Sequence, residues 1–172
     1  MENNKSLPQF KYNPNAYELD IFERFNGTCE CCGKSGDIFY QGLYCAEDVD
    51  YVCPDCIASG EAAKKFDGEF PCGYNRIDNP DAIDELAHRT PNFTSWQDQE
   101  WKDCCGDFCA YLGPVGTKEL EELGIADELF EEDGSFEGWK DARADLVKNS
   151  WFTGHLFQCL HCGKYQLIVE VD

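Results

Sequence analysis

The sequence predicts an α+β fold in which small β elements pack with several short helices. Residues 151–158 and 165–171 are rich in aromatic and β-branched residues, which predicts two strands on either side of a Cys-x-x-Cys-Gly turn. Asn79-Pro80, followed by acidic residues and stopped by Pro91, predicts a helix with its cap. Because strands and helices are both present without βαβ alternation, the α+β class fits best.

The length of 172 residues fits a single domain, which we expect to have four parts. Residues 1–16 are polar and contain two prolines, so they predict an extended arm. Residues 29–66 form a first cysteine-containing module that ends in a short helix. Residues 80–148 are mainly helical, and residues 151–172 form the C-terminal hairpin.

The charge is strongly acidic and restricts the partners that the chain can bind. Thirty-four acidic and 14 basic residues give a formal net charge of -20. Affinity for phosphates comes mostly from Lys and Arg, so we expect no binding to nucleic acid or to an anionic membrane surface. A basic protein partner is compatible with this charge, especially at the acidic segment 117–137, although solubility alone also explains it.

No window approaches 18 consecutive apolar residues, and the polar start of the chain does not resemble a signal peptide. The sequence therefore predicts a cytoplasmic protein whose thiols stay reduced. Twelve cysteines in such a chain favour metal binding over disulfides.

Four of these cysteines have the spacing of a zinc site. Cys29 and Cys32 form one Cys-x-x-Cys pair, and Cys53 and Cys56 form a second pair after twenty residues. Two such turns, known as zinc knuckles, can place four sulfurs around one Zn²⁺ at Zn–S distances of about 2.3 Å. We therefore expect the small β elements of the fold to be zinc-ribbon-like. Four thiolates leave no open coordination position, so we expect a structural site. Cys31 is an alternative to Cys32, but only Cys32 gives the usual spacing and a following glycine.

A second zinc site is expected around the C-terminal Cys-x-x-Cys pair. Its partners must come from the cluster 104–109, and we expect the ligands to be Cys105, Cys109, Cys159 and Cys162. Cys104 is disfavoured because side chains of adjacent residues diverge in an extended segment. His161 could replace a thiolate, although an exposed position is the better interpretation.

No catalytic constellation is visible in the sequence. The leading functional hypothesis is a zinc-stabilised adaptor or interaction protein. The alternatives are an enzyme with its site near the loop 104–109, and a thiol or metal sensor that uses the cysteines left over from the two sites. These are Cys31, Cys45, Cys72 and Cys104.

Short motifs along nearly the whole chain resemble the CbrC-like family, which is associated with colicin tolerance in bacteria. They are Leu7-Pro8-x-Phe10-x-Tyr12-x-Pro14, Cys29-x-x-Cys32-Gly33, Cys53-Pro54-x-Cys56-Ile57-Ala58-x-Gly60, Arg89-Thr90-Pro91-x-Phe93, Cys105-Gly106-Asp107, Cys109-Ala110-Tyr111-Leu112-Gly113 and Cys159-x-x-Cys162-Gly163. Many members of that family have His-Cys where this chain has Cys104-Cys105, which leaves open whether Cys104 replaces Cys105 or Cys109. The resemblance implies a bacterial, cytoplasmic protein and no established activity.

Overall fold

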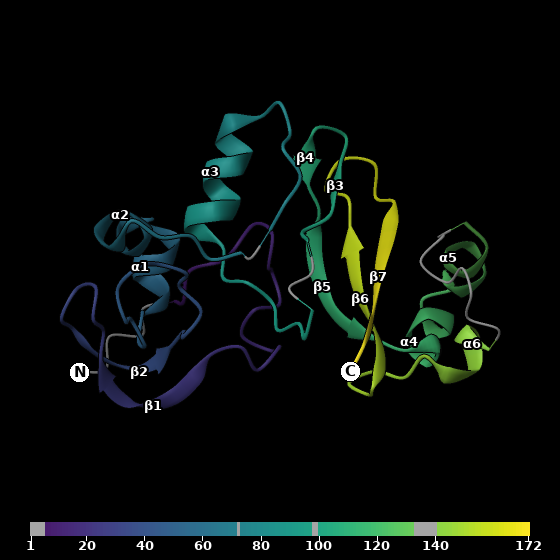
Figure 1. Ribbon diagram of the computed structural model, residues 1–172, viewed down its shortest axis with the longest axis horizontal. Coiled ribbons are helices and arrows are strands. Elements are labelled where there is room, and N and C mark those ends of the chain that lie inside the picture. Colours follow the sequence, from purple (N-terminus) through teal and green to yellow (C-terminus); the bar gives the residue numbers. More distant parts are fainter. Residues whose placement is uncertain (1–5, 72, 98–99, 133–140) are drawn as a thin grey trace. The chain divides into compact units, whose positions relative to one another are not determined.

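The computed structural model describes residues 6–71, 73–97, 100–132 and 141–172. The chain divides into two compact units (Figure 1). Unit 1 contains residues 1–72 and 79–93, and unit 2 contains residues 73–78 and 94–172. Each unit is described separately below. Our expectation that the whole chain behaves as a single domain stays a prediction.

The described part of unit 1 combines one hairpin with three helices. Strands β1 (Glu23–Thr28) and β2 (Ser35–Phe39) pair antiparallel, and helices α1 (Pro54–Ala58), α2 (Glu61–Phe66) and α3 (Pro80–Arg89) follow. Helix α3 begins as expected, because the side chain of Asn79 accepts a hydrogen bond from the amide of Ala82 at 3.1 Å. Pro80 occupies the first turn, where its missing N–H is not needed.

An aromatic core holds unit 1 together. Phe39, Tyr40 and Phe70 are almost completely buried, and the N-terminal segment adds Phe10 and Tyr12. Phe10 belongs to the same apolar cluster as Phe39. Burial of large aromatic side chains removes much apolar surface from water and is the main stabilising contribution available to so small a unit.

Unit 2 is built on a three-stranded antiparallel sheet. Its strands are β5 (Ala110–Val115), β6 (Phe152–Gln158) and β7 (Tyr165–Val171), with β6 in the centre. A separate two-residue hairpin, β3 (Asp103–Cys104) with β4 (Asp107–Phe108), precedes β5. Helices α4 (Thr117–Glu122), α5 (Ala126–Glu132) and α6 (Ala142–Asp145) gather on one side of the sheet (Figure 1).

The three helices and the sheet share an apolar cluster that includes Leu120, Leu129, Leu146, Phe152 and Leu167. Strand β6 is buried along most of its length, as expected for a central strand covered on both faces. Short helices and small antiparallel sheets confirm the α+β class. Among the described residues, no helix is long and apolar enough to cross a bilayer.

Candidate metal centres

The first centre lies in unit 1 and is formed by two Cys-x-x-Cys turns. The sulfur atoms of Cys29, Cys32, Cys53 and Cys56 all lie within 4.8 Å of one another. The first pair occupies the turn between β1 and β2, and the second pair lies where the chain enters α1. The structure thus brings together the four cysteines that the spacing singled out, and their binding of zinc stays a prediction.

Backbone hydrogen bonds shape the turn that carries Cys29. Its amide donates to the carbonyl of Lys34 at 2.9 Å, and the amide of Gly33 donates to the carbonyl of Cys29 at 2.8 Å. Gly33 has φ of +71°, which a residue with a side chain rarely adopts. The amide of Cys53 donates to Sγ of Cys29 at 3.3 Å, so the second turn is tied to the first. Lys65 closes the turn from outside by donating to the carbonyls of Glu30 and Cys31 at 2.8 and 2.7 Å.

The second centre lies in unit 2 and repeats this turn. The amide of Cys159 donates to the carbonyl of Lys164 at 2.9 Å, and the amide of Gly163, with φ of +74°, donates to the carbonyl of Cys159 at 3.1 Å. The sulfur atoms of Cys159 and Cys162 meet two more sulfurs from the β3–β4 hairpin. The four cysteines within 4.8 Å of one another are Cys104, Cys105, Cys159 and Cys162.

The structure therefore places Cys104 where we expected Cys109. Our expectation assumed an extended segment, in which adjacent side chains diverge. Instead Cys105 and Gly106 are the two central residues of a tight hairpin turn, with φ of +56° and +74°. Positive φ at both positions is the signature of a type I′ turn. This left-handed backbone redirects the side chain of Cys105, and the sulfurs of Cys104 and Cys105 lie 3.6 Å apart.

Cys109 lies outside the group. It follows β4, is completely buried, and accepts a hydrogen bond at Sγ from Nε2 of Gln166 at 3.6 Å. Its carbonyl accepts from Nε1 of Trp101 at 2.8 Å. Burial raises the pKa of the Cys109 thiol to about 12. Cys109 is therefore a core residue in this structure.

Spacing between sulfur atoms tests whether the residues fit zinc. A tetrahedral ion with Zn–S bonds of 2.3 Å requires Sγ–Sγ distances of about 3.8 Å. In the first centre the sulfurs of Cys29 and Cys56 lie 3.9 Å apart, and those of Cys32 and Cys53 lie 4.0 Å apart. In the second centre Cys104 and Cys162 lie 3.7 Å apart. A disulfide would require about 2.05 Å, so the spacing fits four thiolates around one ion.

In each centre, backbone amides lower the pKa of one cysteine thiol. Burial raises the pKa of the Cys29 thiol, but the amides of Cys32, Cys53 and Cys31 outweigh it, and the pKa falls below its usual value. In the second centre burial is likewise outweighed by the amides of Cys162 and His161, which lower the pKa of Cys159 to about 6.

The neighbours of these two cysteines behave in the opposite way. Burial, followed by the nearby thiols, raises the pKa of Cys56, and hydrogen bonding with Cys159 raises the pKa of Cys104. Crowded thiols resist ionisation because their charges repel each other. A bound cation removes that penalty, so all four can ligate as thiolates.

His161 is held away from the sulfur cluster. Its Nε2 lies 2.9 Å from Oδ2 of Asp107, a buried residue of β4. More than half of the imidazole is exposed, as expected for a residue between two ligands. The contact ties the Cys159–Cys162 turn to the hairpin that carries Cys104 and Cys105. Asp107 therefore positions the two halves of the second centre relative to each other.

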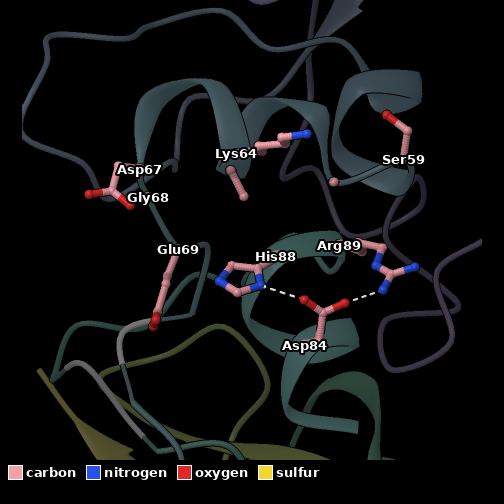
Figure 2. Close-up of a pocket in the computed structure, with 10 residues that line it drawn as sticks. Ser59, Lys64, Asp67, Gly68, Glu69, Asp84, His88 and Arg89 are labelled. Carbon is pink, nitrogen blue, oxygen red and sulfur yellow. Dashed lines mark hydrogen bonds and ion pairs between the residues drawn. The ribbon is translucent and has the colours of Figure 1, made fainter. Parts of the chain in front are cut away.

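Unit 1 also contains a polar hollow of about 580 Å³ between α2 and α3. Figure 2 shows Asp84 between His88 and Arg89, bonded to both. His88 and Arg89 lie in the last turn of α3, where cationic side chains are favoured by the helix dipole. Lys64 and Asp67 also line the hollow, so charges of both signs face it. The arrangement is a helix-end cluster of ion pairs.

Cys31 and Cys45 belong to neither group of four, and Cys72 lies outside the described residues. Both described thiols are partly buried. The sequence analysis missed two signals. One is the left-handed turn at Cys105-Gly106. The other is that a lysine, Lys34 or Lys164, directly follows each Cys-x-x-Cys-Gly turn. Asn-Gly and similar pairs are recognised as hairpin signals, and Cys105-Gly106 before a second short strand could have been read in the same way.

The fold and its two centres define an α+β protein with two four-cysteine clusters. A model of the uncharacterised protein family UPF0167 matches residues 7–171. The chain belongs to this family. No solved structure matches it.

Relatives from three bacteria have similar lengths. The chain is 34% identical over 172 residues to UPF0167 protein PA1536 of Pseudomonas aeruginosa, with 94% of this chain and 95% of that protein covered. It is 35% identical over 169 residues to UPF0167 protein Mb2317 of Mycobacterium bovis and to UPF0167 protein MT2352 of Mycobacterium tuberculosis, covering 92% of this chain and 90% of each relative. None of these names gives an activity.

Proposed function

We propose that the chain is a zinc-stabilised interaction protein in which each unit is held by one four-thiolate zinc ion. The observation that carries the proposal is that two separate groups of four sulfurs each lie within 4.8 Å of one another, with pairs at the distance expected around one zinc ion. When bound, the ion supplies charge balance and a cross-link between segments distant in the sequence. The protein supplies the two amide-stabilised turns that position the sulfurs. This role requires reduced thiols, which agrees with a cytoplasmic location.

Zinc content tests this part of the proposal. Native mass spectrometry of protein purified without chelator should show two zinc ions per chain. Addition of a strong chelator should remove both and abolish the cooperative unfolding transition seen by circular dichroism, because such sites contribute roughly 10 kcal/mol or more in small zinc peptides. A metal-free protein with an unchanged transition would refute the proposal.

We further propose that the partner is a basic protein and that it meets the acidic helices α4 and α5. Glu122, Glu128 and Glu131 are exposed on these helices. Arg143 pairs with Glu121 at 2.9 Å and with Asp127 at 2.6 Å, and Lys118 lies 3.8 Å from Glu122, so part of the acidic charge is neutralised internally. The other carboxylates, among them Glu128 and Glu131, give the surface its negative charge, which favours association with a cationic surface.

A charge-neutralised variant tests the partner. Glu122, Glu128 and Glu131 are changed to Gln, and the matched control changes three exposed acids of unit 1, Glu47→Gln, Asp48→Asn and Asp50→Asn. Quantitative pull-downs should recover a basic protein at low salt with the unaltered chain and with the control. Recovery should fall several-fold with the α4–α5 variant and at high salt, because screening weakens exposed charge pairs. Equal recovery with both variants would contradict the proposed surface.

We also propose that the chain is related to the CbrC-like family. This relationship is supported by the motif runs around the two centres and adds no reaction. An enzyme or sensor site near the loop 104–109 is the alternative. This alternative requires reactive groups at the second centre. It therefore depends on how accessible the thiols of that centre are to solvent.

A further inference from the structure

The two centres share their ligand type and their turn geometry, but they differ in accessibility. In the first centre Cys29 and Cys56 are 1% and 3% exposed, and Cys32 and Cys53 are partly buried. In the second centre only Cys159 is buried, whereas Cys105 and Cys162 are exposed. Since the chemistry of the ligands is the same, the difference in solvent access should decide which centre reacts with small molecules.

Within the second centre, hydrogen bonds to sulfur also distinguish the buried Cys159 from the exposed Cys105 and Cys162. Sγ of Cys159 receives the amides of His161 and Cys162 at 3.4 and 3.5 Å. Within the part of the chain that the structure describes, no backbone amide donates to Sγ of Cys105 or Cys162. N–H donors withdraw electron density from a thiolate and reduce its nucleophilicity, so the exposed sulfurs are also the less protected ones.

A hollow in unit 2 also gives small molecules access to Cys104. A hollow of about 380 Å³ in unit 2 is lined by Cys104 together with Lys102, Lys164 and Tyr165. It is large enough for a small reagent and several waters. The partly buried Cys104 is therefore accessible as well, and its sulfur lies 3.7 Å from that of Cys162.

We propose that the second centre is a modification site for hydroperoxides, at which Cys162 and Cys104 become joined by a disulfide while the first centre is spared. This inference rests on the proposed zinc occupancy of both centres. It assigns to the second centre a chemistry that a purely structural four-thiolate site would not need.

The reaction balances with a hydroperoxide as the oxidant. The thiolate of Cys162 attacks one peroxide oxygen, the O–O bond breaks, and the leaving hydroxide takes a proton to form water. Cys162 is then a sulfenic acid. The thiolate of Cys104 attacks that sulfur, the S–S bond forms, and the S–O bond breaks with loss of a second hydroxide as water. Two thiolates, one hydrogen peroxide and two protons thus give one disulfide and two waters, and the site loses two ligands.

Geometry favours this pair over the adjacent cysteines. Cys104 and Cys105 have sulfurs 3.6 Å apart, but consecutive Cα atoms are only about 3.8 Å apart. Ordinary disulfides have Cα–Cα distances of about 4.4 to 6.8 Å, so a bond between neighbours is strained. Cys104 and Cys162 come from different segments and are free of this restriction.

The experiment begins with the zinc-loaded protein, in which native mass spectrometry first counts two ions per chain. Hydrogen peroxide is then added and samples are taken over time for zinc counting and for mapping of disulfides by mass spectrometry of peptides. We expect one zinc ion to be lost at least ~10-fold faster than the other, together with a Cys104–Cys162 disulfide. A starting count below two refutes the proposed function itself. A count of two followed by equal loss of both ions, or by a disulfide within the first centre, overturns only this inference.

Two variants sharpen the test. Cys104→His keeps a nitrogen ligand for zinc and removes the resolving thiol, so it should start with two ions and leave Cys162 as a sulfenic acid instead of a disulfide after hydrogen peroxide is added. Cys109→Ser removes a thiol outside both groups and should behave like the unaltered chain. A disulfide of Cys162 that forms as fast in Cys104→His as in the unaltered chain would overturn the role of Cys104. Disulfide mapping in the unaltered chain decides the question even where a variant folds poorly.

Discussion

Nε2 of His155 lies 2.6 Å from Oε2 of Glu170, and both residues are almost completely buried in unit 2. Nδ1 of the same ring lies 2.9 Å from the hydroxyl of Tyr111, so the contact links strands β5, β6 and β7. An ionised carboxylate can only accept, so Nε2 carries the proton, and Nδ1 accepts from the Tyr111 hydroxyl. The polar groups are thus satisfied within the sheet.

Glu170 also holds a loop in place. Its Oε1 accepts from the hydroxyl of Ser95 at 3.0 Å, from the amide of Gln97 at 2.7 Å and from the amide of Trp96. Every group around the carboxylate is a donor. A buried acceptor surrounded by donors stabilises the fold as long as it remains an anion.

Glu170→Gln is therefore expected to destabilise unit 2. An amide replaces one oxygen by an NH₂ group, which must face a donor, and a buried donor without an acceptor costs about 1–3 kcal/mol. Denaturant unfolding with zinc present measures the change. The control is Glu131→Gln on the exposed surface of α5, with an expected change within about 0.5 kcal/mol. Similar losses for both substitutions would contradict the structural role of Glu170.

The same pair predicts a pH dependence. Burial lowers the pKa of His155, against the opposing effect of Glu170. Burial raises the pKa of Glu170, but hydrogen bonds from His155, Ser95 and Gln97 outweigh it, and the pKa falls. Both groups bind protons less readily in the folded state, so the unfolded state takes up more protons as the pH falls. The free energy of unfolding should therefore decrease as the pH drops below about 6.5, the ordinary histidine pKa.

NMR of the histidine ring nitrogens tests the first step. At pH 6 His155 should still give the signals of a neutral ring with the proton on Nε2, whereas an ordinary histidine is mostly protonated there. This measurement separates His155 from acid-induced loss of zinc. Titration of His155 with an ordinary pKa would show that its burial has no energetic consequence.

Zinc counting in two serine variants distinguishes the observed second cluster from the one that spacing predicted. Cys104→Ser removes a member of the observed cluster, so the count should fall from two to one. Cys109→Ser should keep both ions and lose about 1–2 kcal/mol of stability, because a hydroxyl replaces a buried thiol. The reverse result would restore Cys109 as a ligand. Both variants remove one sulfur, so each is the control for the other.

Local spacing explains how much of these centres could be predicted. The grouping of Cys29 with Cys32, and of Cys159 with Cys162, depends on four-residue turns that the sequence itself describes. The α+β class followed from equally local signals, such as Asn79-Pro80 at the start of α3. Chain geometry over so few residues leaves little freedom.

Features that depend on backbone handedness or strand register could not be predicted in this way. Cys104 enters the second centre because Cys105 adopts a left-handed conformation that cysteine does not favour. His155 meets Glu170 across β6 and β7, and Ser95 reaches Glu170 from 75 residues away. Register and long-range packing decide these contacts, and apolar periodicity alone does not encode them.

Gly33→Ala is expected to weaken the first centre through the backbone alone. A Cβ atom at Gly33 would meet nothing within 4 Å, so the cost comes from its φ of +71° and should be about 1–2 kcal/mol. The matched control is Gly36→Ala in β2, where φ is not positive and the nearest atom, in the Phe39 ring, lies at an ordinary 3.6 Å. That substitution should change stability by less than about 0.5 kcal/mol. Denaturant unfolding at saturating zinc, with competition titration of zinc affinity, measures both effects. Equal losses would mean that the left-handed turn after Cys32 does not contribute to holding the four sulfurs together.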